Sequence, residues 1–255
     1  MHPNQFDLTG RRALITGASR GIGFALARGL AAAGAAVAIN GRDAATLSAT
    51  AAKLRREGAE VFEAPFDVTR RAEVEAGVAR AEAEFGPIDI LVNNAGMQRR
   101  GSLEDFSDQD WRDLMSVQLD AVFMVGQTVA RRMIARGQGR IINICSALTA
   151  LSRANAAPYA TAKGAAGNLT KGMCADWAKH GLNVNGLAPG YFKTELTAGL
   201  AGDPEFNAWL EGRTPQGRWG RVEELTGAAV FLASDAASFV NGHILYVDGG
   251  LTVTV

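Results

Sequence analysis

A tyrosine and a lysine lie four positions apart at Tyr159 and Lys163, in a stretch with helical spacing. Side chains one helical turn apart share a face of the helix. A phenol with a pKa of ~10 exchanges protons poorly at neutral pH, and a nearby ammonium group lowers that pKa toward the range of efficient acid–base catalysis. Ser146, at the end of the preceding β-rich run, can reach the same oxygen. Such a pair alone is common on solvated helix faces, but with Ser146 it predicts proton transfer at a carbonyl or hydroxyl oxygen.

A glycine-rich turn at residues 16–23 joins the first β-rich run to the first helical segment. Its glycines let the backbone turn tightly and approach a pyrophosphate, while the helix N-terminus supplies N–H groups. The spacing is G-x-x-x-G-x-G, and its place after the first strand of a βαβ unit predicts a dinucleotide site.

The same residues also match the G-x-S-x-G nucleophile elbow of α/β-hydrolases. That elbow normally follows several earlier strands, and its triad needs a histidine after the acid. The only late histidine, His243, begins an apolar run. Hydrolysis therefore ranks last among the alternatives.

The second β-rich run ends with Asn40, Gly41 and Arg42. NAD sites usually carry an acid at this point for the ribose 2′-OH, whereas NADP sites place an arginine near the 2′-phosphate. Gly41 leaves room, Arg42 and Arg20 can converge on a phosphate, and Asp43 lies past the end of the strand. The sequence predicts NADP, with NAD as the alternative.

Short β-rich runs alternate with segments of helical spacing along the chain. This rhythm is typical of right-handed crossovers and of a parallel sheet covered on both faces. It predicts an α/β fold in which residues 1–255 form a single-domain, doubly wound, Rossmann-type sheet of about seven strands. The strands are expected at 13–16, 36–40, 61–66, 88–92, 140–144, 183–187 and 244–247, and the helices at 22–33, 44–57, 72–85, 108–135, 159–180 and 222–233.

One segment, 190–221, departs from the rhythm. It is rich in Gly and Pro and carries Trp209 and Trp219. Ligands bind beyond the carboxyl ends of parallel strands, so a long excursion after the sixth strand predicts a lid over the substrate. A surface excursion with buried tryptophans is the alternative.

The bulk composition excludes several classes of protein. Lys and Arg total 26 and Asp and Glu total 26, a balance that offers no electrostatic footprint for nucleic acid or an anionic membrane. The longest weakly polar stretch, 29–39, is too short to span a bilayer, and residues 1–12 lack the apolar core of a signal peptide. Cys145 and Cys174 have no CxxC partner, which favours a reducing compartment. A cytoplasmic protein is expected.

Together these residues resemble the short-chain dehydrogenase/reductase family over essentially the whole chain. The resemblance implies that Tyr159 is the proton donor or acceptor and that Ser146 positions and polarises the substrate oxygen. It implies that Lys163 holds the nicotinamide ribose and depresses the tyrosine pKa, that no metal is needed, and that the chain forms a homotetramer. The motifs are residues 16–23, Asp67-Val68, Asn93-Asn94-Ala95-Gly96, Ser146, Tyr159 with Lys163, Pro189-Gly190 and Val247-Asp248-Gly249-Gly250.

The resemblance extends the cofactor site beyond the first turn and the end of the second strand. It places Asp67 and Val68 beside the adenine and residues 189–194 on the carboxamide side. The full set of candidate cofactor residues is Gly17, Ser19, Arg20, Gly21, Ile22, Gly23, Asn40, Gly41, Arg42, Asp67, Val68, Asn94, Ala95, Gly96, Tyr159, Lys163, Pro189, Gly190, Tyr191, Phe192 and Thr194.

One candidate catalytic residue departs from the family pattern. Many members carry an asparagine where this sequence has Gln118, and that asparagine helps to hold a water in a proton relay. Gln118 keeps the amide and adds a methylene, which predicts a rearranged relay.

Within the family, the chain most resembles the enzymes that interconvert gluconate and its 5-keto acid. Arg99, Arg100 and Arg153 are therefore candidates to bind a substrate carboxylate, alongside Ser146 and Tyr159. The apolar segment 147–151 favours instead an apolar carbonyl, such as a 3-oxoacyl thioester or a ketone, and a non-catalytic dinucleotide-binding protein is a distant alternative. The matching segments are Phe6-Asp7-Leu8, Asn40-Gly41-Arg42, Gln98-Arg99-Arg100, 141–146, Gly190-Tyr191-Phe192 and 239–250.

Overall fold

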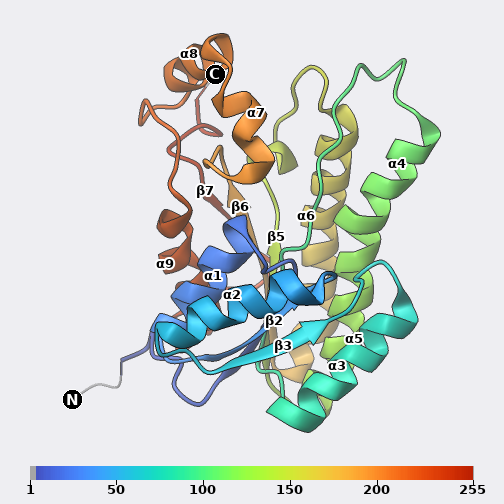
Figure 1. The fold of residues 1–255 in the computed structure, drawn as a ribbon, viewed down its shortest axis with the longest axis vertical. Coiled ribbons are helices and arrows are strands. Elements are labelled where there is room, and N and C mark those ends of the chain that lie inside the picture. The colour runs from blue at the N-terminus through green and yellow to red at the C-terminus, as the bar shows by residue number, and fades with distance from the viewer. Residues whose placement is uncertain (1–3, 255) are drawn as a thin grey trace.

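A computed structural model describes residues 4–254, and within them the chain forms one seven-stranded, all-parallel sheet (Figure 1). The strand order is β3-β2-β1-β4-β5-β6-β7, so the predicted doubly wound fold is confirmed. The order reverses between β1 and β4, which makes their carboxyl ends the switch point where such sheets bind ligands. The strands are β1 Arg12–Ile15, β2 Ala36–Gly41, β3 Val61–Pro65, β4 Ile90–Asn93, β5 Gly139–Ile144, β6 Leu182–Pro189 and β7 Ile244–Val247.

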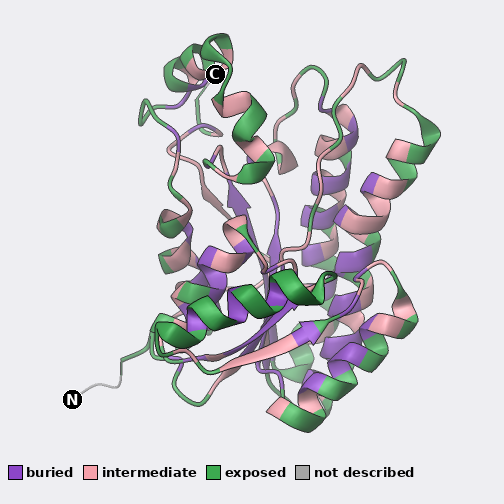
Figure 2. Ribbon diagram, viewed as in Figure 1, coloured by how far each residue is buried: buried purple, intermediate pink, exposed green. Residues whose placement is uncertain are grey.

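Burial along the strands follows from their position in the sheet. The central strands β4 and β6 are buried on both faces, and Ala13, Leu14 and Ile15 of β1 have no exposed surface. Every residue of the edge strand β7 is half-buried instead. Figure 2 shows the buried residues concentrated in the sheet and on the helix faces that cover it.

Helices cover the sheet in two layers, each with its own apolar core. One layer consists of α1 Gly21–Ala32, α2 Ala44–Arg56 and α9 Thr226–Ala233. The other consists of α3 Arg71–Phe85, α5 Ala121–Arg136 and α6 Ala157–Trp177. The predicted helix at 222–233 is the 3-10 turn η5 Val222–Leu225 followed by α9, and the helix predicted to end at 180 ends in the 3-10 turn η3 Ala178–His180.

The helix predicted at 108–135 is not uniform. It consists of α4 Asp108–Met115, a π-helical turn η1 Ser116–Asp120, and α5. A π turn accommodates one residue more than an α turn, and it occurs mostly at functional sites. Helical spacing was detected correctly, but the apolar pattern did not reveal the extra residue.

The segment 190–221 contains more regular structure than the sequence suggested. It forms the 3-10 turn η4 Glu195–Thr197 and two helices, α7 Ala198–Ala201 and α8 Pro204–Arg213. In Figure 1 these helices lie at the upper end of the molecule, beyond the carboxyl ends of β6 and β7. In the part of the chain that the structure describes, no helix is long and apolar enough to cross a membrane.

Candidate active site

The ends of β1 and β4 are joined by a dense set of hydrogen bonds around Thr16. Its hydroxyl accepts from the backbone N–H groups of Asn94 at 2.9 Å and Ala95 at 3.0 Å. The Asn94 amide in turn donates to the carbonyls of Thr16 at 2.9 Å and Gly17 at 3.0 Å. The glycine turn is therefore fixed to the next strand of the sheet. Thr16 was not among the predicted site residues, although a buried threonine at the end of an apolar strand was a visible signal.

Two glycines of the turn are required by close contacts, and one of them, Gly17, is required by its backbone conformation as well. Gly17 has φ +62°, and a Cβ there would lie 2.7 Å from the Ala95 Cα. A Cβ at Gly23 would overlap the Asn94 amide. Helix α1 then begins at Gly21, and no described side chain caps its first N–H groups. These groups fit the predicted phosphate site.

At the end of β2, Asn40 has a structural role, whereas Arg42 is a cation without an ion-pair partner in the described chain. Asn40 is buried, and its amide donates to the carbonyls of Ala64 at 2.9 Å and Phe66 at 3.0 Å, so its side chain holds the sheet together. A Cβ at Gly41 would overlap the Ser19 hydroxyl. Arg42 forms no ion pair within residues 4–254.

The acids near Arg42 are already engaged. Asp43 caps α2 by accepting from the Thr46 N–H at 2.6 Å. Burial tends to raise the pKa of Asp67, but hydrogen bonds from Thr69 and the charges of Arg42 and Arg70 lower it overall. Val68, the predicted adenine neighbour, is buried next to it.

Arg20 and Arg42 were expected to converge on one phosphate, but Arg20 is bound elsewhere. Its guanidinium pairs at 3.1 Å with Glu195, and both side chains are largely exposed. A Cβ at Gly21 would lie 3.9 Å from the Thr194 Cβ, so the two segments also approach each other here. The ion pair links the glycine turn to the segment 190–221.

The predicted catalytic residues meet where β5 ends and α6 begins. Ser146 is the N-cap of the 3-10 turn η2 Ala147–Thr149, and its hydroxyl accepts from the Leu148 N–H at 3.1 Å. Tyr159 and Lys163 lie in the first two turns of α6, with the Lys163 Nζ 5.8 Å from the centre of the tyrosine ring. Lys163 is buried, and its Nζ donates to the Ile144 carbonyl at 2.6 Å.

The expected lowering of the tyrosine pKa is absent from this structure. Burial raises the pKa of Tyr159 to about 12, while a hydrogen bond with Ser146 and the charge of Arg100 act in the opposite direction. The Lys163 Nζ, 5.8 Å from the centre of the tyrosine ring, does not overcome this rise. Burial also lowers the pKa of Lys163 to about 8, because an ammonium group is poorly solvated there.

Gln118 lies in the π turn and is almost completely buried. Its amide nitrogen donates to the Met97 carbonyl, and its amide oxygen has no hydrogen-bond partner among the described residues. The side chain therefore binds the segment that leaves β4. Within residues 4–254 it forms no hydrogen bond with Tyr159 or Lys163.

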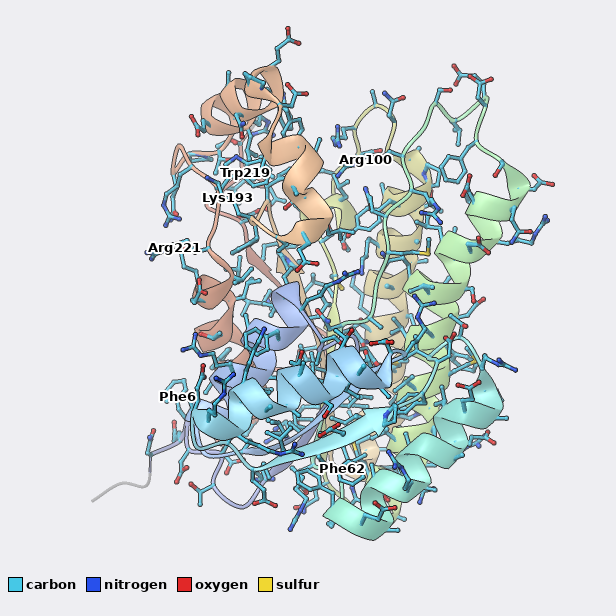
Figure 3. All side chains as sticks on the ribbon, in the orientation of Figure 1. Phe6, Phe62, Arg100, Lys193, Trp219 and Arg221 are labelled. Carbon is cyan, nitrogen blue, oxygen red and sulfur yellow. The ribbon has the colours of Figure 1, made fainter. Side chains whose placement is uncertain are left out.

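The three candidate substrate arginines separate into two groups. Arg99 is half-exposed and pairs with Asp110 at 3.0 Å. Arg100 and Arg153 form no ion pair within residues 4–254. Partial burial lowers the pKa of Arg100, and the charge of the nearby Arg153 lowers it further. Figure 3 labels Arg100 at the same end of the molecule as Trp219.

The exit of β6 contributes the remaining candidates. Gly190 lies against Asp248, because a Cβ there would be 2.7 Å from the Asp248 Cβ. Phe192 is buried in the core, and its carbonyl accepts from the Thr197 hydroxyl at 2.6 Å. Tyr191 faces the opposite way, toward Arg100 and Arg153. Gln98 was noted only as part of a matching segment and not as a site residue, and its amide oxygen is buried without a hydrogen-bond partner in the described chain.

The doubly wound sheet and the side chains at its carboxyl edge define the class of dinucleotide-dependent oxidoreductases. A family model described as Enoyl-(Acyl carrier protein) reductase matches residues 17–252. The chain belongs to the short-chain dehydrogenase/reductase family, which confirms the resemblance carried by its motifs.

Individual relatives that match the chain over its full length carry a more specific name than the family. A gluconate 5-dehydrogenase of Gluconobacter oxydans (strain 621H) is 59% identical over 254 residues, which cover 100% of this chain and 99% of that protein. A 5-keto-D-gluconate 5-reductase of Escherichia coli (strain K12) is 51% identical over 250 residues, or 98% of each chain. The crystal structure of a gluconate 5-dehydrogenase from Burkholderia cenocepacia J2315, in complex with NADP and tartrate, matches with a TM-score of 0.97 and 58% identity over 98% of each chain.

Proposed function

We propose that this chain is an NADP-dependent oxidoreductase that interconverts 5-keto-D-gluconate and D-gluconate. The observation that carries the proposal is the pair Arg100 and Arg153, two neighbouring guanidiniums without an acidic partner in the described structure, beside Tyr159. Arg100 is exposed and Arg153 is half-buried, and two neighbouring like charges favour an anion between them. The relatives named for gluconate and its 5-keto acid support the same substrate.

The proposed chemistry is the reduction of a ketone. A bound nicotinamide supplies or accepts the hydride. In the direction of reduction, Ser146 donates a hydrogen bond to the keto oxygen, and Tyr159 transfers its hydroxyl proton to that oxygen as the carbon accepts the hydride. The carbon–oxygen double bond becomes a hydroxyl, and Tyr159 is left as a phenolate. Lys163 is proposed to hold the nicotinamide ribose from its buried position in α6.

The cofactor assignment rests on Arg42. It is a free cation within the described chain at the end of β2, and the nearby Asp43 is committed to capping α2. A 2′-phosphate there would gain a charge-assisted contact. The Burkholderia cenocepacia relative was solved in complex with NADP. Arg20, held by Glu195, would join the phosphate only by exchanging partners.

The segment 190–221 is proposed to act as the substrate lid. It spans the site, because Arg20 of the glycine turn pairs with Glu195 at one end and Arg153 stacks on Phe206 at the other, with 5.2 Å between the guanidinium and the ring centre. It therefore contacts both the cofactor turn and the catalytic loop.

The test is a panel of carbonyl compounds assayed by NADPH oxidation. We expect reduction of 5-keto-D-gluconate with a kcat/KM at least ~10-fold above that of an uncharged ketone of similar length, the loss typical of one missing ionic contact. A 3-oxoacyl thioester represents the apolar alternative. Faster turnover of the thioester or the neutral ketone would contradict the sugar-acid assignment.

We also propose a cytoplasmic homotetramer. Phe239 is fully exposed, and Phe123 and Trp111 are exposed on α5 and α4, so the described surface offers apolar contacts to further copies of the chain. Light scattering at micromolar concentration measures the mass directly. A monomeric mass would contradict the tetramer.

A further inference from the structure

Tyr191 opens the segment 190–221 and presents a buried hydroxyl that has no hydrogen-bond partner among the described residues. Burying a hydroxyl without a partner costs ~1–3 kcal/mol, so such groups in folded proteins usually serve a water or a ligand.

Aromatic side chains hold the Tyr191 ring in place. It meets Phe206 edge-on with 5.4 Å between ring centres, Trp219 at 6.0 Å and Trp209 at 6.1 Å. The Trp219 indole N–H donates to Asn207 at 2.7 Å, which fixes that ring in turn. Edge-to-face contacts of this kind are specific in geometry. The Tyr191 hydroxyl therefore has a defined position.

The backbone of Tyr191 is fixed as well. Its carbonyl accepts from the Gly220 N–H at 2.9 Å, and the next residue, Phe192, forms a β-bridge with Gly220. The two ends of the segment 190–221 are thereby joined directly under the aromatic cluster. The position of the Tyr191 ring is therefore set by its own backbone as well as by its aromatic neighbours.

The groups that face this hydroxyl are cationic. Burial raises the pKa of Tyr191, and the charges of Arg153 and Arg100 oppose that rise. The Arg153 guanidinium also approaches the hydroxyl closely enough to lower this pKa, but it forms no well-aligned hydrogen bond with it. Arg153 lies over the Phe206 ring, and its Nε is buried without an acceptor in the described structure. Arg100 also influences Tyr159, so the group of three residues reaches the proposed proton donor. We call Arg100, Arg153 and Tyr191 the acid-binding cluster.

The cluster offers two kinds of recognition at once. Guanidinium groups donate only, and they match the two oxygens of a carboxylate. A phenol can both donate and accept, and it therefore suits a neutral hydroxyl group. An unsubstituted carboxylic acid would satisfy the arginines and leave the phenol without a partner. A hydroxylated acid would satisfy all three side chains.

We propose that Tyr191 is a specificity-determining residue that binds a hydroxyl group of the substrate beside its carboxylate, so that the site selects polyhydroxy acids over simple keto acids. This inference rests on the proposed function for the identity of the substrate, but not for its test. It assigns the Tyr191 side chain to the substrate, whereas the other residues of 189–194 remain candidates for the cofactor.

The experiment uses two dicarboxylates that differ only in their hydroxyl groups, tartrate and succinate. Their affinities for the full-length enzyme saturated with NADP⁺ are measured by calorimetry for wild type, Tyr191→Phe and Arg153→Met. We expect wild type to prefer tartrate, and Tyr191→Phe to lose ~5–10-fold in affinity for tartrate with no change for succinate, the loss of one neutral hydrogen bond. Arg153→Met should weaken both acids.

Tyr246→Phe is the matched control, because it removes a tyrosine hydroxyl on the edge strand β7 and should change neither affinity. The inference is overturned if Tyr191→Phe keeps the wild-type ratio of tartrate to succinate affinity, or if wild type binds neither acid. A failure of the proposed function looks different. Wild type would then bind tartrate and lose that preference in Tyr191→Phe, yet would not reduce 5-keto-D-gluconate.

Discussion

The two ends of the site differ in how their polar groups are satisfied. At the cofactor end, the side chains of Thr16, Asn94 and Asn40 all bond to the backbone of neighbouring strands. At the substrate end, the Tyr191 hydroxyl and the Arg153 Nε are buried without partners in the described structure. The side chains that join the strands at the cofactor end are thus satisfied by the protein itself, while the buried polar groups at the substrate end are left for a ligand. Substitutions should damage fold and rate at the first end, and selectivity at the second.

The largest effect is expected where the two ends meet, at Tyr159. Tyr159→Phe removes the transferable proton and keeps the ring, so kcat should fall by at least ~10²-fold, the lower range for a positioned acid–base group. The affinity for NADPH, measured by fluorescence titration, should stay the same. Tyr246→Phe serves as the control. Retained turnover in Tyr159→Phe would remove this residue from the proposed chemistry.

A smaller effect is expected from Arg42, which, unlike Thr16, Asn94 and Asn40, has no partner within the described chain at the cofactor end. Arg42→Met should lower kcat/KM for NADPH by ~30-fold and leave NADH unchanged, which corresponds to one phosphate contact of ~2 kcal/mol. Arg56→Met, on the exposed face of α2, is the matched control. A wild-type preference for NADH would contradict the phosphate assignment. Introducing an acid at Gly41 is less informative, because its Cβ would overlap the Ser19 hydroxyl.

Lys163 makes the stability of the fold depend on pH. Burial lowers its pKa from 10.5 to about 8, so above pH 8 the unfolded chain holds a proton that the folded chain has released. Stability therefore rises with pH in this window. Between pH 8 and 9.5 the free energy of unfolding of wild type should gain about 1.5 kcal/mol relative to Lys163→Met.

Urea denaturation at several pH values measures this difference. The upper limit of pH 9.5 matters because burial raises the pKa of Tyr159 to about 12, and its ordinary value is 10.0. Above pH 10 the unfolded tyrosine would ionise first and lower stability. Parallel pH profiles for wild type and Lys163→Met would show that Lys163 is solvated in the folded chain.

The smallest effect separates two adjacent arginines. Arg100→Met should raise KM for the keto acid by ~10-fold, while Arg99→Met should change it little, because Asp110 already holds the Arg99 guanidinium at the surface. Steady-state kinetics at saturating NADPH checks both variants. Equal effects of the two substitutions would argue that general positive charge, and not a fixed contact, attracts the acid.

The sheet was predictable because its strands are continuous apolar runs, as at Leu14, Ile15 and Val92. Residues of the glycine turn were also predictable, since their spacing is local. Helix α8 was missed although Asp203 and Pro204 form a standard start signal, with the Asp203 carboxylate accepting from the Phe206 N–H at 3.2 Å. The nearby glycines concealed it by lowering the helical propensity of the segment.

Side-chain direction at the substrate end could not be predicted. Arg99 and Arg100 are the same residue type in neighbouring positions and both are exposed, and only the position of Asp110 in α4 decides which one forms an ion pair. The buried state of the Tyr191 hydroxyl likewise depends on rings up to 28 positions further along the chain, such as Trp219. The tyrosine pKa was predicted in the wrong direction because desolvation outweighs any effect of the nearby lysine.

The π turn at Ser116–Asp120 determines which side chains of the following helix, α5, face the sheet. A residue added to an α-helix rotates the downstream part by about 100° relative to the upstream part. The α5 helix is therefore rotated relative to α4 compared with an uninterrupted α-helix, and a single-residue deletion between 116 and 120 would change that rotation by about 100°. The α5 side chains that now face the sheet would then rotate away from it. For this segment, a change in chain length is a more severe mutation than a change in residue type.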